Sequence, residues 1–136
     1  MSEDKKAKLA AELEANLPQY TGTESYTNLR YPWLNGKRFL LTDGAKYLAE
    51  KAGAFWLMDA IASHQMNREV AAESMQFWKL VVDEDAKAIL TCDDGNGKIL
   101  ATQEIPYTDF PLAEIKLYVQ ESEYLAGLVV MLPSEY

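Results

Sequence analysis

The spacing of hydrophobic residues changes along this chain from a helical period to a strand-like one. Within residues 3–17, Leu9, Leu13 and Leu17 recur every four residues and would lie along one face of a helix. Ser2 can cap this helix, and Pro18 marks its end. The pattern therefore predicts a first helix over residues 3–17.

Helical spacing returns after a long connection over residues 18–36 and a short apolar run over 37–41. Thr42 is a suitable N-cap residue, and Gly53 suits the position that follows a helix end. Residues 54–66 carry apolar side chains around most of a helix, which is typical of a helix packed on more than one side. The pattern predicts helices over 43–52 and 54–66, a short helical piece over 68–75 and a short strand over 37–41.

From Phe77 onward the hydrophobic pattern is that of strands. Five short segments rich in β-branched and aromatic residues, separated by turn sequences, predict strands over 77–82, 88–92, 98–105, 115–120 and 124–132. Their short connections favour antiparallel pairing, because a parallel return needs a crossover of a dozen or more residues. Residues 128–132 are apolar on both faces, which predicts a central strand and not an edge strand.

Together these elements predict a single α+β domain over residues 1–136. In this fold, N-terminal helices pack on a C-terminal antiparallel β-meander of four to five strands. The parts are an N-terminal helix (1–17), an aromatic loop with helices (18–76) and an acidic antiparallel sheet (77–136). A chain of 136 residues can bury a hydrophobic core without the help of disulfides or metals.

The net charge of −8 comes entirely from the last part of the chain. Residues 1–82 hold equal numbers of acidic and basic residues, whereas residues 83–136 hold eleven acidic and three basic ones. Such a negative field repels nucleic acid and attracts a protein with a basic surface. The candidate partner-binding acids are Asp83, Glu84, Asp85, Asp93 and Asp94. The alternative is that acidic turns keep a β-rich region soluble and block pairing at sheet edges.

The connection over residues 18–36 is rich in aromatic residues and supplies a second set of candidates, Tyr26, Tyr31 and Trp33. Clustered Tyr and Trp side chains make good binding surfaces, and they also pack loops onto hydrophobic cores. Stacking of nucleic-acid bases on these rings is not expected, because the local charges are only mildly positive. Direct nucleic-acid binding is therefore not expected.

Catalytic and metal chemistry find little support in the sequence. His64 is the only histidine and Cys92 the only cysteine, and their positions do not favour a Cys–His nucleophile. Both residues suit structural roles, and they are too few for a zinc motif. The Asp93-Asp94-Gly95-Asn96 stretch could offer oxygen ligands, but it is more typical of a hairpin turn. No catalytic residue, metal or cofactor is predicted.

A ligand-binding protein or weak hydrolase remains an alternative, with a pocket between the helices and the sheet. Its polar groups would be Asp43, Asp59, His64 and Asp109, provided that they converge on one site. Asp59 lies in the broadly apolar helix, where it must face a solvated strip or have a polar partner. The candidate partners are Arg30, Arg38 and Lys79.

Location and assembly can also be anticipated. A single cysteine allows no intramolecular disulfide, which fits a reducing compartment. The N-terminus lacks the pattern of a signal peptide, and the longest apolar run is too short to cross a membrane. We therefore expect a cytoplasmic protein that does not insert in a membrane. A homodimer could form on the strand of residues 128–132 or on the aromatic loop.

Several short strings of the chain also resemble a known family. They are Thr21-Gly22-Thr23-Glu24, Thr42-Asp43-Gly44, Gly53-Ala54-Phe55-Trp56-Leu57-Met58-Asp59, Phe77-Trp78-Lys79-Leu80, Asp94-Gly95-Asn96 and Gln103-Glu104-Ile105-Pro106-Tyr107-Thr108-Asp109-Phe110-Pro111. Over about residues 18–136 the chain is similar to a family of small uncharacterised bacterial proteins, which often occur on phages and plasmids. The resemblance implies a bacterial or phage-infected host cytoplasm and brings no catalytic residue with it.

The leading hypothesis is a non-enzymatic protein-binding module with an acidic face. A phage or plasmid accessory protein that inhibits a bacterial defence or nucleic-acid-handling factor would suit the size, the charge and the resemblance. The basic surface of such a factor would be its partner.

Overall fold

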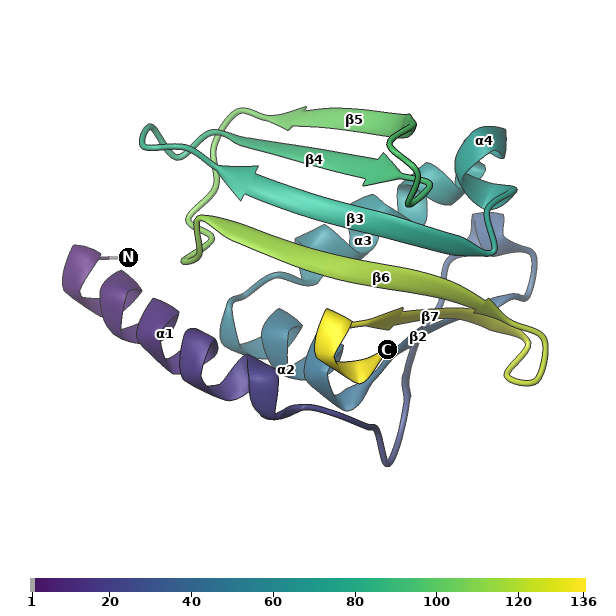
Figure 1. The fold of residues 1–136 in the computed structure, drawn as a ribbon, viewed down its shortest axis with the longest axis horizontal. Helices are drawn as coiled ribbons and strands as arrows, with labels where there is room; N and C mark the ends of the chain where they lie inside the picture. Colours follow the sequence, from purple (N-terminus) through teal and green to yellow (C-terminus); the bar gives the residue numbers. More distant parts are fainter. Residues whose placement is uncertain (1) are drawn as a thin grey trace.

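A computed structural model describes residues 2–136 as a seven-stranded sheet with helices α1, α2 and α3 on one of its faces (Figure 1). This arrangement confirms the predicted α+β class. The sheet is larger than the predicted four to five strands. The helical layer comes from the first half of the chain and most of the sheet from the second half.

The helices form close to where the hydrophobic spacing predicts them. They are α1 (Glu3–Asn16), α2 (Asp43–Lys51), α3 (Phe55–Ser63) and the short α4 (Arg68–Ala71). Single 3₁₀ turns occur at η1 (Leu17–Gln19), η2 (Pro32–Leu34), η3 (His64–Met66) and η4 (Pro133–Glu135). Ser2 caps α1 by accepting a hydrogen bond from the Lys5 backbone N–H, and Thr42 caps α2 in the same way through the Ala45 N–H.

The strands are β1 (Thr27–Leu29), β2 (Arg38–Leu41), β3 (Met75–Val82), β4 (Ala88–Asp93), β5 (Ile99–Ile105), β6 (Glu114–Ser122) and β7 (Gly127–Met131). Their order across the sheet is β1-β2-β7-β6-β3-β4-β5. All neighbouring pairs are antiparallel except β2 and β7, which are parallel. Strand β1 was not predicted, because three residues inside an aromatic connection carry no alternating pattern.

The strand order also corrects the predicted meander. Strand β6 pairs with β3 instead of β5, so the β4–β5 hairpin lies at the edge of the sheet (Figure 1). The connection over residues 106–113 is long enough to carry the chain past β4 and β3. Strand β7 pairs in parallel with β2. The helices and strands that lie between them in the sequence form the long connection that a parallel pair requires.

Strand β7 is central, as predicted from its apolar residues. It lies between β2 and β6, and all five of its residues are buried. Both of its edges are therefore paired, and β7 offers no free edge to a second copy of the chain. The homodimer predicted on this strand cannot form by strand addition.

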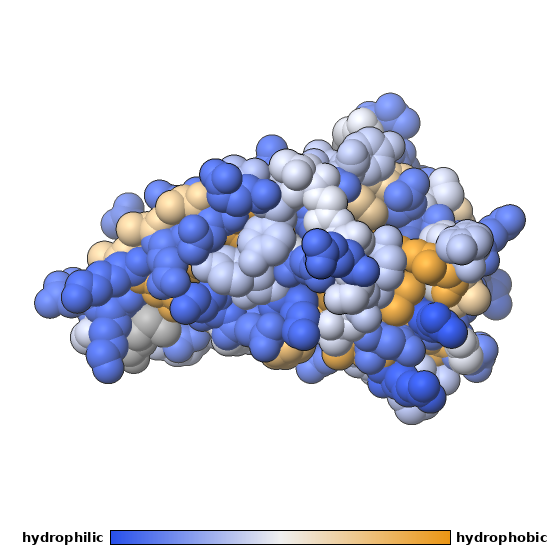
Figure 2. All heavy atoms as spheres, turned by 90° about the horizontal axis from the view of Figure 1, so that it is seen from below, coloured by the Kyte–Doolittle hydropathy of each residue, from blue (hydrophilic) through white to orange (hydrophobic). Residues whose placement is uncertain are grey.

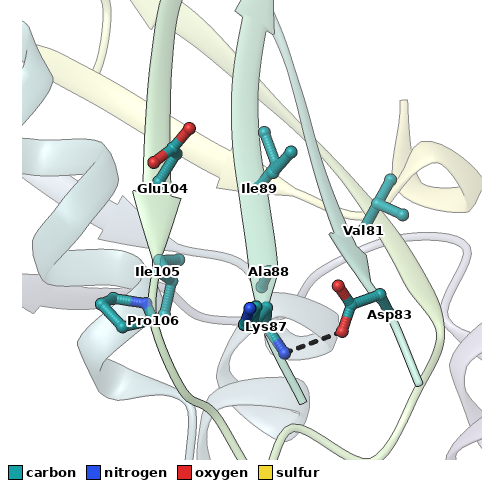
Figure 3. A pocket seen from close by; sticks show the side chains of 8 residues that line it. All are labelled: Val81, Asp83, Lys87, Ala88, Ile89, Glu104, Ile105 and Pro106. Atoms are coloured by element: carbon teal, nitrogen blue, oxygen red, sulfur yellow. Dashed lines mark hydrogen bonds between the residues drawn. The ribbon is translucent and has the colours of Figure 1, made fainter. Parts of the chain in front are cut away.

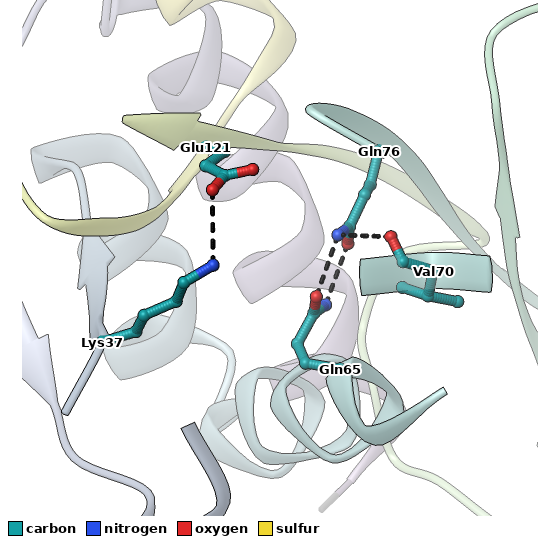
Figure 4. Close-up of polar contacts among 5 residues, drawn as sticks. All are labelled: Lys37, Gln65, Val70, Gln76 and Glu121. Carbon is teal, nitrogen blue, oxygen red and sulfur yellow. Dashed lines mark hydrogen bonds and ion pairs between the residues drawn. The ribbon is translucent and has the colours of Figure 1, made fainter. Parts of the chain in front are cut away.

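A buried polar network ties the helical layer to the sheet (Figure 4). Gln76 on β3 and Gln65 on η3 face each other, and each amide donates a hydrogen bond of 2.9 Å to the other. Gln76 also donates to the Val70 carbonyl and accepts from the Trp78 indole N–H. Buried amides require such partners, so this pair fixes how the helical segment sits on β3.

Within residues 2–136, no long helix covers the opposite face of the sheet, here called the outer face (Figure 1). A small buried cluster of Leu40, Val129 and Met131 covers it near β7. The exposed ion pair between Lys37 and Glu121 (Figure 4) joins two distant segments at 3.3 Å and contributes little to stability. The outward-facing residues of β3 and β4 remain partly exposed beyond this cluster.

Candidate functional site

The five candidate acids fall into two separate groups. Asp83, Glu84 and Asp85 follow β3, in the turn that leads into β4. Asp93 ends β4, and Asp94 begins the turn that leads into β5. A strand of six residues separates the two turns, which corresponds to a distance of about 20 Å. The structure therefore does not bring these five side chains into one patch.

Three of the acids stabilise the turns in which they lie. Asp83 Oδ1 accepts hydrogen bonds from the backbone N–H groups of Asp85, at 2.8 Å, and Lys87, at 3.0 Å. Asp93 and Asp94 each accept one from the N–H group two residues further on, at 2.7 and 2.8 Å. These are the local bonds with which Asp favours turns. A structural role within the turns therefore accounts for Asp83, Asp93 and Asp94.

Glu84 and Asp85 are different, because their carboxylates have no such role. Both residues are exposed, and neither forms an ion pair within residues 2–136. Ala86, the next residue, adopts a left-handed conformation with φ of 60°. The turn therefore presents two solvated negative charges at one end of the sheet.

A groove of about 490 Å³ lies beside this turn (Figure 3). Two aliphatic side chains of the outer face line it, Val81 on β3 and Ile89 on β4, which are 42% and 47% exposed. Asp83, Lys87 and Glu104 supply its charged groups. An apolar centre with charged groups at its rim is the general arrangement of protein interfaces, so this groove is a candidate binding surface.

The aromatic candidates do not join this groove. The Tyr31 hydroxyl donates a hydrogen bond to Asp59 on α3, and the Trp33 indole N–H donates one of 2.8 Å to the Ala62 carbonyl. The Tyr31 and Trp33 ring centroids are 5.0 Å apart. Burial and the Asp59 carboxylate raise the pKa of Tyr31 above its ordinary value. These two rings pack the loop onto α3, while Tyr26 lies elsewhere.

Tyr26 lines a second cavity, of about 390 Å³, near the C-terminal turn η4. Glu135 also lines it, and its carboxylate accepts hydrogen bonds from Thr42 Oγ1, at 2.7 Å, and from the Gly44 backbone N–H, at 3.0 Å. These donors lie at the N-terminus of α2, where the helix dipole favours a negative charge. Glu135 therefore attaches the C-terminal turn to α2.

The four groups of the ligand-binding or hydrolase alternative have separate surroundings. Asp43 accepts a hydrogen bond from the Glu24 backbone N–H, and Asp59 accepts one from a tyrosine, not from a basic residue. His64 contacts Gln103 through a bond of 2.8 Å. Asp109 is exposed in the β5–β6 connection. No hydrogen bond or ion pair joins any two of the four within residues 2–136.

Between α3 and the central strands, the part of the chain that the structure describes leaves no room for a ligand. The space between α3 and the central strands is closed by apolar side chains, among them Leu57, Ile61 and Trp78. Among residues 2–136, no group of three or more His, Cys, Asp or Glu side chains is placed to hold a metal ion. Cys92 is buried, and this burial, with Asp93 nearby, raises the pKa of its thiol to about 12. A buried thiol with a raised pKa is a poor nucleophile at neutral pH.

Sequence reasoning missed the groove residues Val81, Ile89 and Glu104. Each is an ordinary strand residue, and their proximity depends on how β3, β4 and β5 pair. Neighbouring residues of a strand point to opposite faces, so Val81 faces outward while Leu80 is buried. The exposure of Ile89 follows only once the sheet is known to carry its helices on the other face.

Hydrophilic residues cover most of the side seen in Figure 2, where hydrophobic residues reach the surface in separate patches.

These features define an α+β protein with a seven-stranded sheet and helices on one of its faces. Within residues 2–136, no helix has the length and apolar character needed to cross a membrane. The chain belongs to a family of unknown function, DUF6876, whose model matches residues 11–136. The match confirms the predicted membership of an uncharacterised family. No curated protein and no solved structure matches the chain.

Proposed function

We propose that the protein is a non-enzymatic binding module that uses the β3–β4 end of its sheet to bind a basic surface of another protein. The observation that carries the proposal is the pair of solvated carboxylates of Glu84 and Asp85, which lie beside a groove with exposed aliphatic residues. Negative charge at the rim of such a surface attracts a positively charged partner and speeds its association.

The proposal gives the two acidic turns different roles. Asp93 and Asp94 accept hydrogen bonds from the backbone N–H groups of Gly95 and Asn96, and a Cβ atom at Gly95 would lie 2.5 Å from the Phe77 ring. We assign that turn to the stability of the hairpin. The β3–β4 turn, with Glu84 and Asp85, is assigned to binding.

The partner class follows from the sign of the charge. Proteins that handle nucleic acid present basic surfaces, and an acidic surface can occupy them. A phage or plasmid accessory protein that inhibits a bacterial defence or nucleic-acid-handling factor in the cytoplasm would act in this way. This role is supported by the net charge of −8 together with the location of that charge in residues 83–136.

Capture from bacterial lysate, followed by mass spectrometry, tests the proposal. The informative variant carries Glu84→Lys and Asp85→Lys, because these side chains hold no turn together. A matched control carries Glu14→Lys and Glu123→Lys, which change the net charge equally at exposed positions elsewhere. We expect a basic protein that wild type and control retain and that the Glu84/Asp85 variant loses.

High salt should also release this protein, because the attraction is between exposed charges. A partner that both double variants retain equally would refute the assignment to the β3–β4 turn. Recovery of no protein at low salt would refute the binding function itself, and a screen for bound metabolites would then be the next experiment.

A further inference from the structure

The register of the sheet places a particular row of side chains across the groove. Four residues on neighbouring strands are directly opposite one another on the outer face: Glu104, Ile89, Val81 and Glu114. The row therefore has two aliphatic residues in its centre and a carboxylate at each end. Figure 3 shows Glu104, Ile89 and Val81 standing side by side on β5, β4 and β3.

The length of this row can be worked out from strand spacing. Neighbouring strands lie about 4.8 Å apart, so the three intervals from β5 to β6 place Glu104 and Glu114 about 14 Å apart. In an extended peptide, alternate side chains face the same way and each residue advances about 3.4 Å. Residues i and i+4 of such a peptide are also about 14 Å apart, with residue i+2 midway between them.

The charges around the row favour a basic ligand. Glu104 is exposed, and Glu114 forms an exposed ion pair with Lys79 at 3.9 Å, the longest of the three described. Two more bases lie nearby: Lys87 lines the groove, and the exposed Lys116 lies directly opposite Lys79 on the same face. Five carboxylates lie at this end of the sheet, those of Asp83, Glu84, Asp85, Glu104 and Glu114. The surroundings of the apolar centre are therefore negative overall.

We propose that the groove binds an extended segment of a partner protein, with an aliphatic side chain flanked by Lys or Arg two residues away on each side. The segment crosses the strands, its aliphatic side chain contacts Val81 and Ile89, and its basic residues reach Glu104 and Glu114. This inference rests on the proposed function and specifies the chemistry of the partner. In this proposal, contacts in the apolar centre provide most of the affinity. The two carboxylates select partners whose basic residues have the matching spacing.

Selection from a random peptide library on the full chain tests the inference without assuming a sequence. We expect enriched peptides to share the pattern basic–any–aliphatic–any–basic. The strongest one, labelled with a fluorophore, is then measured by anisotropy. Ile89→Glu should weaken it about tenfold or more, as expected for loss of a central apolar contact. Ile99→Glu is the matched control, since Ile99 is 53% exposed, against 47% for Ile89, and lies at the end of β5 away from Glu104.

Glu104→Gln and Glu114→Gln should each weaken binding about threefold and reduce its dependence on salt. Enrichment of no shared pattern, enrichment of peptides without basic residues, or equal effects of Ile89→Glu and Ile99→Glu would overturn the inference. A dimer in sedimentation that Ile89→Glu alone dissociates would also overturn it, because a second copy of the chain would then cover the groove.

The same variants separate this inference from the proposed function. If the lysate partner is lost by the Glu84/Asp85 variant but retained by Ile89→Glu, the groove inference fails and the acidic-turn proposal stands. If Ile89→Glu weakens binding of the selected peptides but the Glu84/Asp85 variant still retains the lysate partner, the groove inference stands and the acidic-turn proposal fails.

Discussion

Replacing Gln76 with Leu should destabilise the protein strongly, although the change makes the core more apolar. The Gln76 side chain takes part in four hydrogen bonds, two with Gln65 and one each with the Val70 carbonyl and the Trp78 indole. After the change, the Val70 carbonyl keeps the Glu73 N–H as a donor. The side-chain amide oxygen of Gln65 and the indole N–H of Trp78 then lose their hydrogen-bond partners in a buried site.

Each buried polar group left without a partner costs about 1–3 kcal/mol. Gln76→Leu leaves two such groups, and the burial of the apolar Leu side chain offsets part of their cost. We therefore expect the free energy of unfolding to fall by about 3 kcal/mol. This is a large fraction of the roughly 5–15 kcal/mol that a domain of this kind possesses. Adding Gln65→Leu should recover part of the loss, because the second change removes one of the two unpaired groups.

Urea unfolding followed by far-ultraviolet circular dichroism gives the free energies of the wild type, the two single variants and the double variant. We expect a coupling energy of about 1 kcal/mol or more between Gln65 and Gln76, since they share two hydrogen bonds. A loss below about 0.5 kcal/mol for Gln76→Leu, or strictly additive single effects, would refute the reasoning that this network holds the helical segment on β3.

Three further predictions concern other parts of the fold. Gly44→Ala should lower the free energy of unfolding by about 1–3 kcal/mol, measured in urea, because a Cβ atom there would lie 2.6 Å from Glu135 Oε1. Folding raises the pKa of Tyr31, so the protonated tyrosine contributes its full share to the free energy of unfolding below pH 10.0, the ordinary tyrosine value. This contribution is lost as the pH rises toward the pKa in the folded state. Thermal melts should therefore show a smaller loss above pH 10.0 for Tyr31→Phe than for wild type, whereas Tyr124→Phe, at a 95% exposed position, should behave as wild type does. Cys92 should react with iodoacetamide at pH 8 far more slowly in the folded protein than in urea, because its buried thiol has a pKa of about 12, and equal rates would contradict that burial.

The positions of the helices and strands could be predicted largely from the local spacing of hydrophobic residues. Which strands pair with one another could not. Strands β3 to β7 carry alternating or continuous apolar patterns, so their positions follow from the residues themselves. The pairing of β6 with β3, and of β7 with β2, depends on contacts between residues far apart in sequence. Short connections favour a meander, and this general preference led to the wrong order for β6.

The candidate site shows the same limit. Charge along the sequence grouped Asp83 and Asp93 together, but β4 holds them at opposite ends of the sheet. The sequence could indicate that Asp59 needs a partner, yet the partner is a tyrosine of the aromatic loop and not one of the basic candidates. The row through Ile89 exists only in the register of four strands, which no local pattern specifies.

The association rate of a captured partner tests the central claim most directly. It is measured by biolayer interferometry at low and high salt for wild type, for the Glu84→Lys/Asp85→Lys variant and for the Glu14→Lys/Glu123→Lys control. We predict that reversal at Glu84 and Asp85 slows association about tenfold at low salt and removes most of its salt dependence, while the control remains close to wild type. Equal association rates for the two variants would contradict binding through the acidic end of the sheet.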